Sequence, residues 1–243
     1  MGVVMKKRTA ILAIALISTS LLSSYAFATS SFASEKKPST TGATSATLST
    51  KSKVAKALCR TTDAIPHFPQ PLAAPRIGKR EKVQRNVTIT FKTNCGDIVV
   101  YADATKAPLT VRAIAMLANA GFYDQSLCHR LTTTGIFVLQ CGDPTASGRG
   151  GPAFMIPDEF VPQEVANNYP AGSVAMANTG PNTSGSQFFI VYADSTLNPD
   201  FTLWGQVIKG LDIVKAIAAF GVVNGGTDGA PMQKVAIESV SVR

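Results

Sequence analysis

The 243-residue sequence has few of the side chains from which metal and catalytic sites are most often built. It holds two histidines, four cysteines and a single tryptophan. The cysteine spacings match no zinc pattern, and His67 and His129 do not complete one, so we expect no metal site. A Ser-His-acid triad would have to use His129, and its neighbour Arg130 is an unfavourable companion for a general base. There is also no Gly-x-Ser-x-Gly motif, so these absences argue against a hydrolase.

The N-terminal apolar run is too short to cross a bilayer. Residues 10–22 make a run of 13 residues, whereas a membrane span needs about 20. The basic residues Lys6, Lys7 and Arg8 precede it, and the small-x-small pattern at residues 26–28 follows. We therefore predict a cleaved signal peptide over residues 1–28, a secreted or cell-envelope location, and no stable membrane span after cleavage. An uncleaved N-terminal anchor is the alternative.

Acidic residues are scarce in the first third of the chain. Residues 1–85 contain 14 Lys or Arg and 3 Asp or Glu, whereas residues 86–243 contain 9 and 12. The formal charge of +8 therefore belongs to the leader and a tail. A nucleic-acid-binding domain would carry a basic folded face, so we expect no nucleic-acid partner. A separate hypothesis makes the basic tail an adhesive for anionic polymers of the cell envelope.

The four cysteines form an even set, which in an exported chain favours disulfides over metal ligands. Three pairings are possible. We prefer Cys128 with Cys141, because both lie on strand-like segments that flank one short connection. Cys59 then pairs with Cys95. The alternative is four free thiols, two of them buried.

Residues 29–85 are predicted to form a flexible tether rich in Ser, Thr, Pro and Lys. Residues 39–52 are of low complexity, and four prolines between 66 and 75 favour extended chain over helix. A clamp near Cys59 would hold this tether to the domain that begins at Asn86.

The hydrophobic pattern of residues 86–243 predicts many short strands and two helices. The expected strands cover residues 87–91, 98–101, 136–141, 173–177, 188–192, 203–207 and 235–242. One helix is expected from Pro108 to a stop at Gly121, and the other over residues 211–220. This content favours a closed antiparallel barrel over a βαβ sheet. The Gly-rich stretch 148–151 lacks the Lys-Ser/Thr pair of a phosphate-binding loop, so its glycines are interpreted as tight backbone positions.

Three segments carry more information than their composition. They are His129-Arg130 with Phe137-Val138-Leu139-Gln140, the string MANTGPNTSGSQFFI at residues 176–190, and Trp204-Gly205-Gln206-Val207. On these residues the sequence from about Val87 to Arg243 resembles the cyclophilins. The resemblance implies a mainly β fold, a closed eight-stranded antiparallel barrel capped by two α-helices. It also implies peptidyl-prolyl cis-trans isomerase activity on proline-containing polypeptides, with no cofactor. We expect a monomer that assists the folding of exported proteins.

The resemblance also implies roles for individual residues. Arg130 would donate a hydrogen bond toward the prolyl nitrogen in the twisted state, and Gln140 would hold Arg130. The main chain of Asn178 would bind substrate beside the proline, with Ala177 and Gln187 lining the groove. The apolar pocket for the proline ring would be formed by Phe137, Val138, Phe189 and Leu197, and Phe201 is a further substrate-binding candidate. The alternative is that the pocket residues only pack in the core and that Arg130 only forms a structural salt bridge.

The sequence departs from the common cyclophilin pattern at several positions. Val138 stands where Met is usual, and two extra residues lie between Arg130 and Phe137. Thr196 replaces a Trp, which removes a large indole rim and argues against tight binding of cyclosporin. Phe201 replaces a His and keeps an aromatic wall without a polar tip, so substrate preference is expected to shift. A non-catalytic module that binds proline segments in the same groove is the alternative function.

Overall fold

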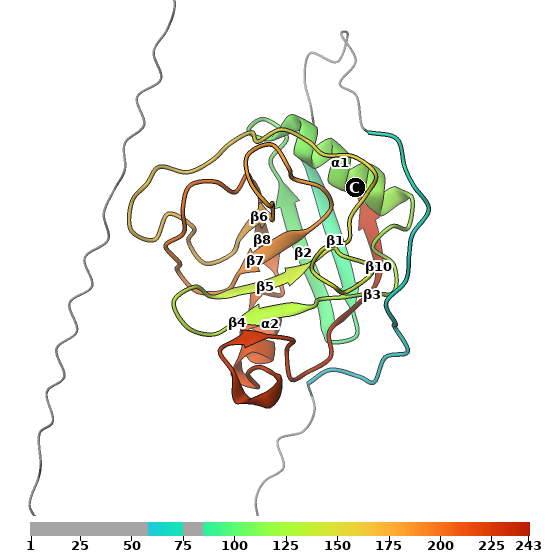
Figure 1. Ribbon diagram of the computed structural model, residues 1–243, viewed down its shortest axis with the longest axis vertical. Coiled ribbons are helices and arrows are strands. Elements are labelled where there is room, and N and C mark those ends of the chain that lie inside the picture. Colours follow the sequence, from blue (N-terminus) through green and yellow to red (C-terminus); the bar gives the residue numbers. More distant parts are fainter. Residues whose placement is uncertain (1–57, 75–84) are drawn as a thin grey trace, which may run out of the picture. The chain divides into compact units, whose positions relative to one another are not determined.

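The computed structural model describes residues 58–74 and 85–243, which are built around one antiparallel sheet that curls into a half-barrel (Figure 1). The ten strands are β1 (Val87–Thr93), β2 (Gly96–Ala102), β3 (Ser126–Leu127), β4 (Arg130–Thr132), β5 (Val138–Cys141), β6 (Ser173–Met176), β7 (Phe188–Val191), β8 (Leu203–Lys209), β9 (Asp228–Gly229) and β10 (Ala236–Val242). The helices are α1 (Pro108–Asn119), α2 (Leu211–Ala219) and the short 3-10 helix η1 (Val223–Gly225). The predicted signal peptide and the rest of the predicted tether lie outside the described residues.

The sheet order is β3-β10-β1-β2-β8-β6-β7-β5-β4-β9. The mainly β content and the two helices agree with the sequence-based expectation, but the expectation of a closed eight-stranded barrel is wrong. Two extra strands of two residues each, β3 and β9, stand at opposite ends of the sheet, and within the described residues they do not pair with each other. Strand β3 pairs with β10 and β9 pairs with β4, so no ladder of backbone hydrogen bonds joins the two ends and the described sheet stays open.

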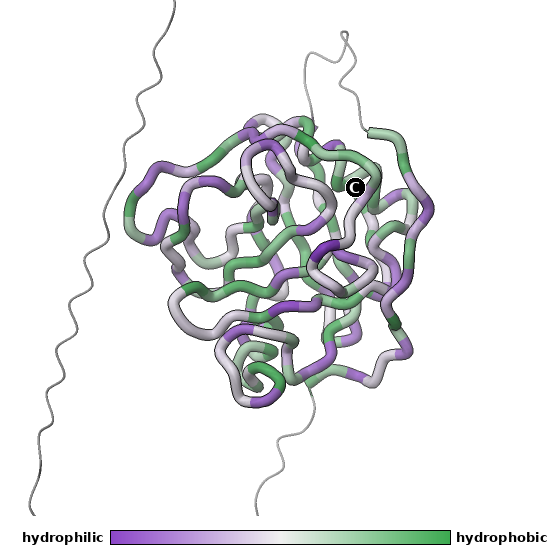
Figure 2. Tube along the Cα trace, viewed as in Figure 1, coloured by the Kyte–Doolittle hydropathy of each residue, from purple (hydrophilic) through white to green (hydrophobic). Residues whose placement is uncertain are grey.

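Alternation along the central strands separates a core face from an outer face. On β5, Leu139 and Cys141 pack into the main core, whereas Val138 belongs to a second, smaller apolar cluster. On β7, Phe188 and Ile190 pack into the main core and Phe189 into the smaller cluster. This is the period of two expected for a strand buried on both sides. Figure 2 shows hydrophobic stretches along the strands and hydrophilic residues mainly in the connections.

Helix α1 begins at Pro108 without a capping side chain from its N-cap residue, Ala107. The carboxylate of Glu159, in a loop distant in the sequence, caps the helix instead. Glu159 accepts hydrogen bonds from the backbone amides of Leu109 at 2.9 Å and Thr110 at 2.8 Å. A negative charge at this position satisfies amides that have no partner within the helix and complements the helix dipole.

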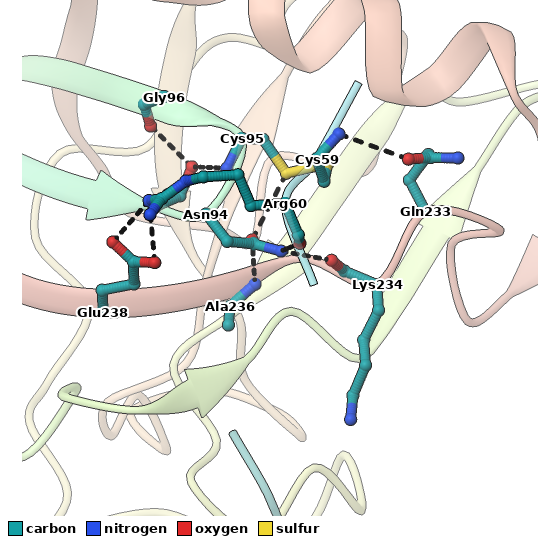
Figure 3. The surroundings of a disulfide bond; sticks show 10 residues. Cys59, Arg60, Asn94, Cys95, Gly96, Gln233, Lys234, Ala236 and Glu238 are labelled. Atoms are coloured by element: carbon teal, nitrogen blue, oxygen red, sulfur yellow. Dashed lines mark hydrogen bonds and ion pairs between the residues drawn. A yellow bond between two sulfur atoms is a disulfide. The ribbon is translucent and has the colours of Figure 1, made fainter. Parts of the chain in front are cut away.

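A segment that precedes the domain, residues 58–74, is fixed to it; we call this segment the strap. The Cys59–Cys95 disulfide, predicted from the sequence, is confirmed (Figure 3). Next to it, the buried Asn94 donates to the carbonyl of Arg60 at 2.7 Å and accepts from the amide of Ala236 at 2.8 Å. The Arg60 guanidinium also forms a salt bridge with Glu238 at 2.8 Å. In the residues that the structure describes, no helix is long and apolar enough to cross a membrane.

Candidate active site

One transverse row of paired residues crosses four neighbouring strands. Arg130 on β4 pairs with Gln140 on β5, Gln140 pairs with Phe189 on β7, and Phe189 pairs with Ala175 on β6. Residues paired across antiparallel strands project to the same face of the sheet. The strand register therefore brings the two predicted catalytic residues together on the face opposite the main core.

Arg130 is held on two sides by polar side chains. Its Nε and Nη2 atoms donate to the two carboxylate oxygens of Asp228 at 2.7 and 2.8 Å, and its Nη1 atom donates to Gln140 Oε1 at 3.1 Å. The hydrogen bond with Asp228 raises the pKa of Arg130, and the same bond lowers the pKa of Asp228. A guanidinium has five N–H donors, so these three bonds leave one N–H on each terminal nitrogen.

Gln140 continues the network away from Arg130. Its Nε2 atom donates to Gln187 Oε1 at 2.9 Å, and Gln187 Nε2 donates to the carbonyl of Gly150 at 2.8 Å. Each amide is thus oriented by a partner on both sides. The position of Arg130 is tied through this chain to the loop that contains Gly150.

That loop is organised by the buried carboxylate of Asp143. It accepts hydrogen bonds from the amide and hydroxyl of Thr145 at 2.8 and 2.6 Å and from the amide of Gly150 at 3.0 Å. Burial alone would raise the pKa of Asp143, but these hydrogen bonds outweigh it and lower the pKa. A Cβ atom at position 150 would lie 2.0 Å from Asp143 Oδ1, so only glycine fits there. The Gly-rich stretch therefore serves tight backbone packing.

The smaller apolar cluster contains Phe189 and Ala175 from the row. Its buried members are Val138, Tyr169, Ala175, Phe189 and Val191. The predicted substrate-binding residues Ala177, Leu197 and Phe201 pack around it. The rings of Phe189 and Phe201 meet edge to face with centroids 5.4 Å apart.

Tyr169 fixes one wall of this cluster. Its hydroxyl donates to the carbonyl of Phe201 at 3.0 Å and accepts from the amide of the same residue at 3.1 Å. Burial raises the pKa of Tyr169 to about 12, so the phenol remains protonated and can donate at any physiological pH.

One predicted pocket residue lies outside the smaller apolar cluster. Phe137 packs against the main core and meets the ring of Tyr192 at 5.9 Å, so it lies apart from the other pocket residues. The side chain of Asn178 donates to the carbonyl of Asp200 at 2.7 Å, and its predicted role in the groove concerns its main chain. Two contributors, Asp228 and Tyr169, were not anticipated. No local motif marks either residue, because each acts on a partner far away in the sequence.

A second disulfide joins the segment just before β4 to the end of β5. Cys128 and Cys141 are bonded, as predicted, and lie within two residues of Arg130 and next to Gln140 respectively. Between Cys128 and Arg130 lies His129, whose two ring nitrogens are buried without a hydrogen-bond partner among the described residues. Burial lowers the pKa of His129, so its ring is neutral at neutral pH.

A cavity of about 480 Å³ opens beside the row. Gln140 and the three predicted groove residues, Ala177, Asn178 and Gln187, line one part of it. Among the described residues there is no group of His, Cys, Asp or Glu arranged to hold a metal ion. The geometry therefore offers a fixed cation, an apolar cluster and an adjoining groove, which together suit the binding of a polypeptide with an apolar ring.

Comparison with known proteins assigns the class. Residues 88–242 match the family described as cyclophilin type peptidyl-prolyl cis-trans isomerase. The chain belongs to this family, and the resemblance seen in the sequence is confirmed.

Two similar proteins from mycobacteria carry the name of this family's activity. The chain is 41% identical over 182 residues to the probable peptidyl-prolyl cis-trans isomerase B of Mycobacterium leprae, covering 70% of this chain and 62% of that protein. The protein of the same name from Mycobacterium tuberculosis gives 41% over 182 residues, covering 70% of this chain and 59% of the relative. The chain thus spans about three fifths of the length of these relatives.

Solved structures give the same family. A crystal structure of a cyclophilin type peptidyl-prolyl cis-trans isomerase from Cryptosporidium parvum superposes with a TM-score of 0.57 at 25% identity, covering 65% of this chain and 98% of the other. A structure of that protein in the presence of the dipeptide Ala-Pro gives a TM-score of 0.56, also at 25% identity, covering 64% of this chain and 98% of the other.

Proposed function

We propose that the chain catalyses cis-trans isomerisation of X–Pro bonds in polypeptides. The barrier of about 20 kcal/mol arises because the amide nitrogen shares its lone pair with the carbonyl. In the twisted state the lone pair is localised on nitrogen. A catalyst that favours this state over both planar forms accelerates exchange in both directions.

The observation that carries the proposal is the set of three hydrogen bonds that hold the Arg130 side chain. Asp228 and Gln140 together fix the guanidinium plane, and an N–H on each terminal nitrogen remains outside these bonds. Such an N–H can donate to the localised lone pair of the prolyl nitrogen. A hydrogen bond of this kind is weak in the planar amide and strong in the twisted state, so it stabilises the transition state selectively.

The neighbouring residues supply binding. The apolar cluster around Phe189 and Val138 accepts the proline ring, with Leu197 and Phe201 at its edge. The groove at Ala177, Asn178 and Gln187 holds the adjoining substrate backbone. The printed names of the relatives, and the use of Ala-Pro with the Cryptosporidium protein, support the same substrate class.

Exchange spectroscopy on a proline peptide tests this function in the full chain. The protein is expected to produce exchange cross-peaks between the cis and trans forms. Arg130→Ala is expected to abolish them while the peptide still shifts on binding. Binding without exchange in the wild-type protein would instead identify a non-catalytic module.

We further propose that the chain is exported and assists the folding of exported proteins. The support is the predicted signal over residues 1–28 together with two disulfides, which persist in oxidising compartments. Mass spectrometry of the non-reduced protein from the producing cells should show cleavage after Ala28 and a mass lower by four hydrogens. An intact leader with free thiols inside the cell would contradict export.

A further inference from the structure

The strap reaches the loop that borders the candidate active site. The strap precedes the family match at residues 88–242, yet the amide of His67 donates to the carbonyl of Pro144 at 2.9 Å. Pro144 follows Asp143, whose carboxylate organises this loop. The strap is also anchored on either side of this contact, by the Cys59–Cys95 disulfide and by Leu72, which packs against the main core.

The two residues after this contact lie at the cavity. Phe68 and Pro69 line it together with Phe154 and Met155 from the loop that follows the Gly-rich stretch. Phe68 is 90% exposed and Met155 is 66% exposed. Phe68 on the anchored strap and Met155 on the neighbouring loop thus leave two large apolar side chains in water on one cavity rim, which is typical of a binding surface.

The same cavity is continuous with the proposed substrate groove. Gln140, which holds Arg130, lines it together with Asn178 and Gln187. An extended polypeptide advances about 3.3 Å per residue. A substrate whose proline ring lies beside Arg130, and whose backbone follows the groove at Asn178 and Gln187, enters the same cavity that Phe68 and Met155 line.

We propose that Phe68, Pro69 and Met155 form an apolar subsite that selects substrates with a large apolar side chain two to four residues from the isomerised proline. This inference rests on the proposed isomerase function and adds a determinant that lies outside the matched domain. Burial of the Phe68 ring against an apolar substrate side chain supplies the preference. A small polar side chain gains nothing from the same contact.

Two series of proline peptides test the subsite in the full chain. Leu or Ser is placed in turn at each position two to four residues from the proline, and kcat/KM is measured for each peptide. In the wild type, Leu is preferred over Ser at one position. Phe68→Ala is expected to lower this Leu-to-Ser ratio about tenfold, since it removes most of the apolar contact. Phe68→Leu should retain most of the preference.

Ile65→Ala is the matched control, because Ile65 is 67% exposed on the same strap and does not line the cavity. It should keep the wild-type ratio. Equal ratios in wild type and Phe68→Ala would overturn the subsite, as would an equal loss in Ile65→Ala. Self-association that depends on Phe68, with an unchanged ratio, would overturn it in favour of an interface between two copies.

Binding separates this inference from the proposed function. The same peptides are titrated into Arg130→Ala and into Arg130→Ala with Phe68→Ala, and their affinities are compared. The subsite predicts that the Leu preference in affinity is present in the first protein and lost in the second. If the wild type binds with this preference but turns over no peptide, the proposed function fails and the subsite stands.

Discussion

The guanidinium of Arg130 and the carboxylate of Asp228 form a two-pronged ion pair, with N–O distances of 2.7 and 2.8 Å. The two residues are separated by 98 positions in the sequence and are brought together by the pairing of β4 with the two-residue strand β9. Both side chains are partly exposed, at 39% and 52%, so solvent screens the pair and its value for stability is small. Its consequence is the fixed orientation of Arg130.

Asp228 is therefore expected to act as a positioning residue. Asp228→Ala frees the guanidinium to rotate, so kcat on a proline peptide should fall about tenfold while KM changes little. Asp228→Glu should restore part of the loss. Glu238→Ala removes the comparable ion pair with Arg60 and is the control for a general effect of losing a surface salt bridge. Unchanged kcat in Asp228→Ala would show that Gln140 alone orients Arg130.

The buried ring of His129 predicts a pH dependence of stability. Its pKa in the folded protein lies below the ordinary value of 6.5, so the unfolded chain binds the proton more readily. Stability is complete above pH 6.5 and declines as the pH falls from there to the folded pKa. Urea unfolding at pH 7.5 and 5.5 should show a smaller decline in His129→Gln than in the wild type. His67→Gln, which alters the strap histidine, is the control, and an identical decline in all three proteins would refute the assignment.

The Cys128–Cys141 disulfide is expected to support both stability and the candidate active site. It closes a loop of about 14 residues, so replacing both cysteines with serine should lower the free energy of unfolding by about 3 kcal/mol. Since the bond flanks Arg130 and Gln140, kcat should fall as well. Replacing Cys59 and Cys95 provides the comparison, because that bond lies at the strap anchor. Equal effects of the two double variants on kcat would show that the disulfide near Arg130 has no special role there.

The carboxylate of Glu159 is expected to stabilise α1 without affecting catalysis. Glu159→Ala leaves the amides of Leu109 and Thr110 without this acceptor, and loss of such a cap costs about 1 kcal/mol. Chemical denaturation measures the change. Glu164→Ala, at an exposed position of the same loop, should leave stability unaltered. A Glu159→Ala protein as stable as the wild type would contradict the cap.

The sequence predicts the longer elements of this fold because each carries its own pattern. The seven expected strands and both helices are found, with ends displaced by about two residues. The strands β3, β4 and β9 are too short to show a period, so they were not expected. Yet β4 carries Arg130 and β9 carries Asp228. The prediction of a closed barrel was wrong because the sheet ends in two such short strands, β3 and β9, which do not pair with each other in the described residues.

The candidate site was predictable only where the family motif is local. Arg130 and Gln140 pair across neighbouring strands, which agrees with their proposed roles. Phe137 lies apart from the pocket, since strand alternation directs it to the side opposite Val138 and Gln140. The contribution of Phe68 depends on the path of the strap across the domain, which no periodicity encodes.

The most direct test of the central claim is the rate of X–Pro isomerisation by the full chain with Arg130 altered. The wild type should accelerate isomerisation of a proline peptide. Arg130→Ala should lower kcat/KM about 100- to 1,000-fold, as expected for loss of a donor aimed at the transition state. Arg130→Lys keeps the positive charge but loses the planar guanidinium with its several N–H donors, so it should recover only a small part of the rate. Equal rates for wild type and Arg130→Ala would contradict the account.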